Sequence, residues 1–328
     1  LGDVYKRQVY VVFAMVSILR RARRPNAGAA TPILTLMVQK ARRLDVTRAA
    51  RRRGPQGHVT RGTTAAHRMR RVDRWLLDVH GPRLRAAEGP DGTAACPLVI
   101  DLGFGARPTT AVELHTRVRS VAPGAQTLGL EIDPERVAHA RQSAPAAPGL
   151  DWAVGGFEVP APRPPTVIRA FNVLRQYREE DVATVWAMLS SRLAPGGVVV
   201  EGTCSENGRR AAWVQLDAGG PVSLTIAVHF GDVDQPSDVA ARLPKALIHR
   251  NVPGERVHEF LSAADSAWAL HGPLAAYGKR QRWIAMAQSL KDAGWPVLGR
   301  VHQWRRGELS VAWSAVAPGA GSSADQRR

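Results

Sequence analysis

Short apolar runs alternate with amphipathic stretches between residues 98 and 200, and the change of period predicts where each element begins and ends. The apolar runs are brief enough for buried strands, whereas the stretches between them repeat apolar residues every three or four positions, as helices do. Strands that alternate with helices indicate an α/β domain built on a parallel sheet. The predicted strands are residues 98–100 and 127–130, and the predicted helices are residues 109–121, 135–143 and 182–193.

The pattern changes in the C-terminal half. Paired strand-like runs joined by short polar or glycine-rich segments replace the strand–helix alternation, and such pairs predict antiparallel hairpins. Between the two pairs lies a mixed segment, residues 231–280, whose period is not uniform. The expected elements are one hairpin from the runs 212–216 and 222–230, a helix at 280–293, and a second pair from the runs 296–304 and 309–316.

Residues 1–56 have no sustained period. The apolar run at 9–19 is too short for a membrane span, which needs roughly 20 residues, and it lacks a clear signal-peptide cleavage site. A helix lying on a membrane surface stays open. Residues 1–8 resemble the adaptor-derived translation seen at the ends of environmental sequence fragments. We therefore expect a disordered or artefactual extension, with patterned sequence from about His58 and a helix over 69–84 that Gly81-Pro82 ends.

Charge is concentrated at the N-terminus. The net charge is +17, and residues 1–90 hold 20 Lys or Arg against 5 Asp or Glu, whereas residues 91–328 hold 25 against 23. Nucleic acid or an anionic membrane is one partner for such a segment, and a solvated basic extension is the simpler alternative. The five arginines between Arg61 and Arg74 have two interpretations: a helix packed over the sheet, or a basic lid over an anionic substrate.

Only two cysteines are present, Cys96 and Cys204. Two cannot form a disulfide framework or a cysteine-rich zinc site, so we expect no metal. They favour a reducing compartment, and we expect a cytoplasmic protein.

The strongest chemical signal follows the first predicted strand. Gly103 and Gly105 come directly after Asp101, and glycines there permit positive φ and let a ligand approach the backbone. Glu131 ends the next strand, where a carboxylate can accept hydrogen bonds from the ribose of an adenosine cofactor. A dinucleotide loop needs a third glycine where this chain has Pro108, which weighs against NAD.

These motifs resemble those of class I S-adenosylmethionine-dependent methyltransferases. Asp101-x-Gly103-x-Gly105 resembles motif I of that family, Glu131 its acidic residue after the second strand, residues 172–174 its Asn-Val-Leu element, and residues 193–197 its Leu-x-Pro-Gly-Gly turn. Residues 167–171 resemble its fourth strand, and residues 198–200 the fifth strand that follows the turn. Residues 61–75 with the Asp101 loop further resemble an actinobacterial branch of the family, over about 58–317. One departure is Arg107, where the family has another glycine.

The resemblance implies a fold, a cofactor and the residues that bind it. The fold is a Rossmann-like doubly wound α/β sheet of seven strands with an antiparallel terminal hairpin and a C-terminal-half insertion. The domain covers 57–317, with the insertion at about 208–280, the extension at 1–56 and a tail at 318–328. The cofactor is S-adenosyl-L-methionine, and the residues implied to bind it are Asp101, Gly103, Gly105, Glu131, Ile132 and Phe157.

Position after the fourth strand suggests the catalytic residues Asn172, Arg175 and Tyr177. Tyr177 could order a nucleophile, and Arg169 and Arg175 could receive an anionic group. Alternatively, both arginines pair with the acidic residues 179–181 at the next helix start. His249 and Arg250 are candidates for a cap over the site. Motifs for methylation of exocyclic amines or of cytosine C5 are missing, because Val173 follows Asn172 and Thr203 precedes Cys204.

Three functions remain open. The first is methyl transfer from S-adenosylmethionine to a small-molecule or lipid-linked acceptor. The second is an RNA methyltransferase, supported by the basic N-terminus but by no RNA-binding motif. The third is a cofactor-binding protein without catalysis. We expect a small-molecule acceptor rather than nucleic acid, and no membrane span. The sequence does not indicate an oligomeric state.

Overall fold

A computed structural model describes residues 54–319 apart from 61, 63 and 89–95. Its strands form one nine-stranded mixed sheet in the order β3-β2-β1-β4-β5-β6-β7-β9-β8. The strands are β1 (Leu98–Leu102), β2 (Gln126–Glu131), β3 (Leu150–Val154), β4 (Val167–Phe171), β5 (Val198–Cys204), β6 (Arg210–Asp217), β7 (Gly220–Val228), β8 (Val297–Leu298) and β9 (Glu308–Ala312). The α-helices are α3 (Arg70–Glu88), α4 (Thr109–Arg119), α5 (Pro134–Ser143), α6 (Glu179–Ser190), α7 (Lys245–Ile248), α8 (Arg256–Leu270), α9 (Lys279–Asp292) and α10 (Val301–Trp304). The 3-10 helices are η1 (Leu174–Gln176), η2 (Phe230–Asp232), η3 (Pro236–Arg242), η4 (Gly272–Tyr277) and η5 (Trp313–Ala315).

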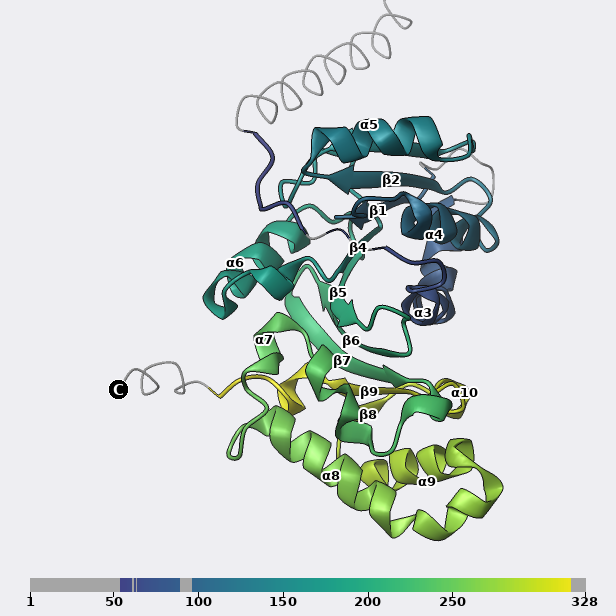
Figure 1. Ribbon diagram of the computed structural model, residues 1–328, viewed down its shortest axis with the longest axis vertical. Coiled ribbons are helices and arrows are strands. Elements are labelled where there is room, and N and C mark those ends of the chain that lie inside the picture. The colour runs from purple at the N-terminus through teal and green to yellow at the C-terminus, as the bar shows by residue number, and fades with distance from the viewer. Residues whose placement is uncertain (1–53, 61, 63, 89–95, 320–328) are drawn as a thin grey trace, which may run out of the picture. The chain divides into compact units, whose positions relative to one another are not determined.

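The first five strands are parallel and form the doubly wound half of the sheet. The strand β1 pairs with β2 on one side and with β4 on the other, so the chain reverses its direction of travel across the sheet at this point. In Figure 1, α3 and α4 lie to one side of these strands and α6 to the other. Ligands of doubly wound sheets bind at the carboxyl ends of the strands where the order reverses, here between β1 and β4. The predicted Rossmann-like α/β fold is therefore confirmed.

The remaining strands are antiparallel, and the predicted number of seven is wrong. A hairpin leads from β5 directly into β6, and a second hairpin joins β6 to β7. The predicted hairpin in the C-terminal half is thus part of the main sheet. The last predicted pair is also shorter than expected: β8 has two residues and pairs with β9, and the chain then turns into α10. Gly299, at φ 87°, ends β8 in a backbone conformation that a regular strand does not have.

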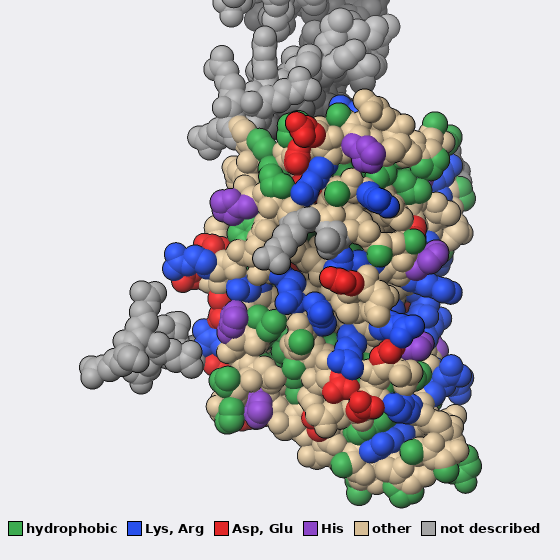
Figure 2. Space-filling view, in the orientation of Figure 1, with side chains coloured by type: hydrophobic (Ala, Val, Ile, Leu, Met, Phe, Trp, Pro, Cys, Tyr) green, Lys and Arg blue, Asp and Glu red, His purple; other side chains and the backbone are tan. Residues whose placement is uncertain are grey.

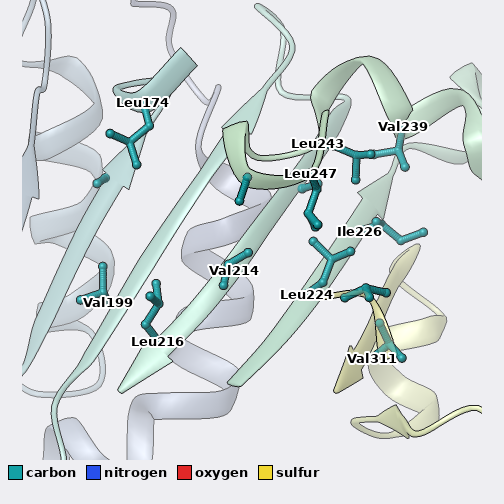
Figure 3. Packing of buried hydrophobic residues seen from close by; sticks show 14 of the residues in the cluster. Leu174, Val199, Val214, Leu216, Leu224, Ile226, Val239, Leu243, Leu247 and Val311 are labelled. Atoms are coloured by element: carbon teal, nitrogen blue, oxygen red, sulfur yellow. The ribbon is translucent and has the colours of Figure 1, made fainter. Parts of the chain in front are cut away.

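Side chains alternate between the two faces of the sheet and form two main cores. On β1, Val99 packs with α3 and α4, whereas Ile100 packs with α6 on the opposite face. The second face continues over β6, β7 and β9, which α8 and α9 cover. Figure 3 shows how strand residues such as Val214 and Leu224 meet Leu243 and Leu247 from the segment between β7 and α8. This part of the predicted insertion packs on the sheet and shares its core.

The helix α3 continues through Gly81-Pro82, where the sequence predicts its end. Proline lacks the N–H that would bond back to the preceding turn, so the helix loses one hydrogen bond there. Beyond it, Leu84 is fully buried in the core under α3 and α4. Tertiary packing of this leucine therefore keeps the last turn helical although the local sequence disfavours it.

Among the described residues, no helix has both the length and the apolar character that a bilayer crossing requires. The short apolar run at 9–19 lies outside these residues, as do Arg61 and the segment that resembles an adaptor-derived translation.

Candidate active site

A cavity of about 420 Å³ opens at the carboxyl ends of β1 and β4, where the strand order reverses. Its walls come from the glycine loop after β1, the segment after β4, the loop after β5, the N-terminal end of α3 and η3. The residues that line it are Thr60, Gly62, Thr64, Arg68, Met69, Asp101, Leu102, Gly103, Phe104, Gly105, Thr110, Phe171, Asn172, Arg175, Gln176, Glu206 and Arg242.

Both glycines of the loop after β1 need their conformational freedom. Gly103 has φ 71° and Gly105 has φ 85°, in the left-handed region that side chains disfavour. A Cβ atom on Gly103 would lie 2.8 Å from a methyl carbon of Val173, so the post-β4 segment could not approach. The Gly103 N–H donates to the carbonyl oxygen of Leu130, which ties the loop to β2. The two predicted glycines therefore shape one wall of the cavity.

Glu131 connects the end of β2 to this loop. Its side chain is buried; one carboxylate oxygen accepts a hydrogen bond from the Gly105 N–H and the other from the Ile132 N–H, both at 2.9 Å. The Arg136 guanidinium lies 3.7 Å from the same carboxylate. Glu131 is thus not an exposed loop carboxylate, and it holds a buried negative charge beside the backbone N–H groups of the glycine loop.

Asp101 lines the cavity, but its carboxylate is bound to Arg169 on β4. The Arg169 guanidinium donates to Asp101 at 3.0 Å and also to the buried Asp73 of α3. Burial alone would lower the pKa of Arg169, but the Asp101 and Asp73 carboxylates outweigh it and raise that pKa. Arg169 therefore stays charged and links α3, β1 and β4. Both sequence-based interpretations of Arg169, an anion receptor or a partner for residues 179–181, are wrong.

The segment after β4 brings Asn172 and Arg175 to the cavity. Asn172 has φ 59°, a strained value that asparagine tolerates better than most residues, and its amide bonds to the backbone N–H and the sulfur of Cys204. Arg175 is exposed and donates to the carbonyl oxygen of Ala241 at 3.1 Å. Partial burial, followed by the charges of Arg242 and Arg68, lowers the pKa of Arg175.

Tyr177 lies outside the cavity lining. It is buried, its ring packs against Phe157 at 5.2 Å between centroids, and its hydroxyl accepts a hydrogen bond from the His58 N–H. Burial raises the pKa of this hydroxyl. The structure thus groups Tyr177 with the predicted cofactor-binding residues Ile132 and Phe157, apart from Asn172 and Arg175.

Residues 54–60, which we call the strap, cover this second group. The Gln56 carbonyl accepts a hydrogen bond from the Phe157 N–H at 2.9 Å, and the Gln56 N–H donates to Glu158 at 2.7 Å. A Cβ atom on Gly57 would lie 2.8 Å from both Ile132 and Tyr177. Beyond the strap, the Ala106 N–H donates to the Gly62 carbonyl. The strap therefore fills the space between Ile132 and Phe157, and no pattern in residues 54–60 predicted this placement.

The predicted cap residues are engaged elsewhere. Arg250 donates to Glu179 at 2.6 Å and to Glu255 at 3.1 Å, and His249 lies 3.1 Å from the Lys245 ammonium group. Neither His249 nor Arg250 lines the cavity; the one lining residue from η3 is Arg242. Sequence reasoning missed Arg242, Thr110 and Gln176, because nothing in the local pattern distinguishes them from surface residues. Among the described residues, no cluster of His, Cys, Asp and Glu is arranged to hold a metal ion.

The fold is a doubly wound α/β fold. Its glycine loop after β1 and the carboxylate at the end of β2 are arranged as in nucleotide-binding folds of this class. No family model and no curated protein matches the sequence. Three solved structures illustrate the similarity found by fold comparison. The first is magnesium protoporphyrin IX methyltransferase from Synechocystis with S-adenosylhomocysteine bound, at 18% identity and a TM-score of 0.31, covering 43% of this chain and 57% of that one.

The second is human N-acetylserotonin methyltransferase in complex with S-adenosylmethionine, at 20% identity and a TM-score of 0.28, covering 51% of each chain. The third is a pericyclic reaction enzyme, at 14% identity and a TM-score of 0.29, covering 37% of this chain and 30% of that one. The matched region spans about half the length of the first two solved chains. Similarity this low assigns no function, so the function is argued from the geometry of this chain.

Proposed function

We propose that the protein transfers a methyl group from S-adenosylmethionine to a small acceptor held in the cavity between β1 and β4. The observation that carries the proposal is the junction of Glu131 with the glycine loop. A buried carboxylate that accepts from the Gly105 N–H marks a place for ribose hydroxyls, because they can donate to the same oxygens. The methionine end of the cofactor then faces Gly103 and Thr110, which line the cavity.

The residues that line the cavity fit the methionine end of such a cofactor. The strap covers Ile132 and Phe157, where its adenine would lie. Ile132 and Phe157 would contact the adenine, but Gly57 packs between them. Cofactor binding therefore requires the strap to leave this position. Such a movement breaks the hydrogen bonds of Gln56 with Phe157 and Glu158, of His58 with Tyr177 and of the Thr60 carbonyl with Arg136. It also breaks those that Gln176 donates to the carbonyls of His58 and Val59.

When bound, S-adenosylmethionine supplies a methyl group activated by a sulfonium. The chain's own residues contribute position and exclusion of water, which is most of what an in-line displacement needs. Asn172 fixes the chain after β4 through its bonds to Cys204, so Arg175 and Gln176 face the cavity from a defined turn. Asn172 and Tyr177 act here as positioning residues, because their polar atoms are bonded within the protein.

A small acceptor suits the cavity better than RNA does. About 420 Å³ falls in the range of pockets for small molecules and is closed on several sides by loops from different strands. Residues 57–328 hold 32 basic and 26 acidic residues, so this part carries little excess charge for a polyanion.

A non-catalytic cofactor-binding protein is the second candidate. Two observations favour it: the strap lies on the predicted adenine contacts, and the side chains of Asn172 and Tyr177 are already bonded within the chain. Such a protein would bind S-adenosylhomocysteine and transfer no methyl group.

Two measurements separate the candidates. Calorimetry should show binding of S-adenosylhomocysteine and none of NADH; NADH binding without S-adenosylhomocysteine binding contradicts the proposal. Incubation with cell extract and S-adenosylmethionine labelled on its methyl group should then give a labelled small molecule. Binding without any labelled product supports the non-catalytic alternative.

A further inference from the structure

We propose that the acceptor carries a carboxylate or phosphate group, which Arg175 and Arg242 bind in the cavity with Arg68 behind them. This inference rests on the proposed function, because it names the substrate class of the same site. The three arginines come from distant parts of the chain: Arg68 precedes α3, Arg175 lies in η1 and Arg242 ends η3. All three line one cavity, which brings three positive charges together.

The backbone holds these arginines in place. Arg68 is buried and donates to the carbonyl oxygens of Ser205 at 3.2 Å and Cys204 at 3.5 Å. Arg175 donates to the carbonyl oxygen of Ala241, the residue before Arg242. The Thr203 hydroxyl donates to the carbonyl oxygen of Arg242 and so fixes the end of η3 to β5. The carbonyl oxygen of Ala241 is neutral, so it orients the Arg175 guanidinium without cancelling its charge.

The acidic residues of the lining do not neutralise this cluster. Asp101 is paired with the buried Arg169 at 2.8 Å, and Glu206 is exposed. Among the described residues, no carboxylate forms an ion pair with Arg175 or Arg242. Burial, followed by the charges of Arg242 and Arg68, lowers the pKa of Arg175, and the two charges act as like charges at close range do. An anion relieves that repulsion.

The face in Figure 2 agrees with this placement. Lys and Arg side chains gather in a band across its middle, at the height of β5 and β6 in Figure 1, with fewer Asp and Glu side chains among them. Guanidinium groups pair with carboxylates and phosphates in two-point geometry, which makes arginine suited to both.

The carboxylate of the cofactor's methionine end is another source of the same chemistry. It carries one negative charge beside an ammonium group, whereas the cavity presents three guanidinium groups. The lining of the cavity also includes residues beyond the glycine loop, among them Arg175 after β4 and Arg242 at the end of η3. We therefore assign the anion to the acceptor, and the experiment separates the two sources.

The test is a titration of the full chain, saturated with S-adenosylhomocysteine, with benzoate, inorganic phosphate and the neutral benzamide. We expect benzoate or phosphate to bind and benzamide to bind at least tenfold more weakly. Arg175→Gln and Arg242→Gln should each weaken anion binding about tenfold, since each removes a charged hydrogen-bond donor. Arg192→Gln is the matched control, because Arg192 is an exposed arginine at the opposite end of β5, and it should bind as the wild type does.

Equal anion affinity in all three variants overturns the inference. Anion binding that is present in the free chain and lost on saturation with S-adenosylhomocysteine also overturns it, because the arginines then serve the cofactor. If the chain does not bind S-adenosylhomocysteine but binds anions through Arg175 and Arg242, the proposed function fails and the anion site stands.

Discussion

At the scale of single residues, Glu131 combines a structural role in the glycine loop with a proposed role in cofactor binding. Its carboxylate accepts hydrogen bonds from the Gly105 and Ile132 N–H groups, and the proposed function has the cofactor ribose donate to the same oxygens. We expect Glu131→Ala to weaken S-adenosylhomocysteine binding by about 1–3 kcal/mol and to lower the free energy of unfolding by a similar amount, because buried donors lose their acceptor. Calorimetry and urea denaturation measure the two effects.

The matched control is Glu135→Ala in the first turn of α5, where the side chain is exposed. It should change both quantities little. A Glu131→Ala chain that binds the cofactor as tightly as the wild type would show that the carboxylate serves only the loop.

Glu201 on β5 is a buried carboxyl group with a pH-dependent consequence. Burial raises its pKa to about 8, against a lowering by the hydrogen bond from Trp186. Between about pH 4.5 and 8 the unfolded chain ionises this group while the folded chain keeps it protonated. The stabilisation is therefore complete below about pH 4.5 and is lost as the pH rises through 8, by up to about 1.4 kcal/mol per pH unit.

Glu201→Gln should flatten this dependence, because an amide does not ionise. Chemical denaturation of both chains at pH 5, 6.5 and 8 measures it. A wild type and a variant with parallel profiles would contradict the assignment of the slope to Glu201.

At the scale of elements, the proposed function requires the strap to move away from Ile132 and Phe157. Gly57 has φ 132°, and a side chain there would meet Ile132, Tyr177 and Phe157. Gly57→Val should displace the strap, and we expect S-adenosylhomocysteine affinity to rise about fivefold to thirtyfold, since a clash and a strained φ together disfavour the covered state by about 1–2 kcal/mol.

Gly54→Ala is the control, since Gly54 also has a positive φ, 41°, but no atom within 4 Å of its would-be Cβ. It should leave the affinity unchanged. Calorimetry gives the affinities, and faster protease cleavage near residues 54–60 in Gly57→Val alone would report strap release. Reduced affinity in Gly57→Val would mean that the strap forms part of the cofactor site.

Four of the five parallel strands were predictable because local signals agree with the tertiary structure there, whereas β3 was not predicted. The apolar run at 98–100, Gly103 and Gly105 locate β1 and its loop, and Pro134 begins α5 where expected. Glu131 was predicted from its place at a strand end. Elements fixed by distant contacts were not predictable: the last turn of α3 depends on the burial of Leu84, and α10 follows a strand that Gly299 ends early.

The residues of the candidate site likewise divide into those that the sequence predicts and those that only tertiary contacts reveal. Residues of the glycine loop follow from spacing along the chain, whereas Arg242 reaches the cavity because η3 packs on β6 and β7. The pairing of Asp101 with Arg169 was hidden because it depends on the register of β1 with β4, which places the two opposite each other.

At the scale of the whole molecule, charge and candidate chemistry lie in different parts of the chain. The basic excess belongs to residues 1–90, whereas the cavity lies mainly among residues beyond 97. We expect the full chain to bind RNA through backbone phosphates alone. With about five neutralised phosphates, affinity should fall at least a hundredfold between about 50 and 300 mM salt.

Anisotropy with a fluorescent RNA at several salt concentrations measures this dependence. In an extract incubated with labelled S-adenosylmethionine, purified RNA should carry no label. Labelled RNA would contradict the small-molecule acceptor and favour an RNA methyltransferase.

The two-residue length of β8 has a consequence for solubility at high concentration. A sheet edge exposes backbone N–H and C=O groups that can pair with another chain, and long flat edges invite open-ended stacking. In the described part of the chain, the antiparallel half of the sheet ends at Val297–Leu298, where the chain turns into α10 within a few residues. Such a short edge strand offers few pairing groups, so the antiparallel half widens the sheet without ending in a long strand that could serve as a template for aggregation.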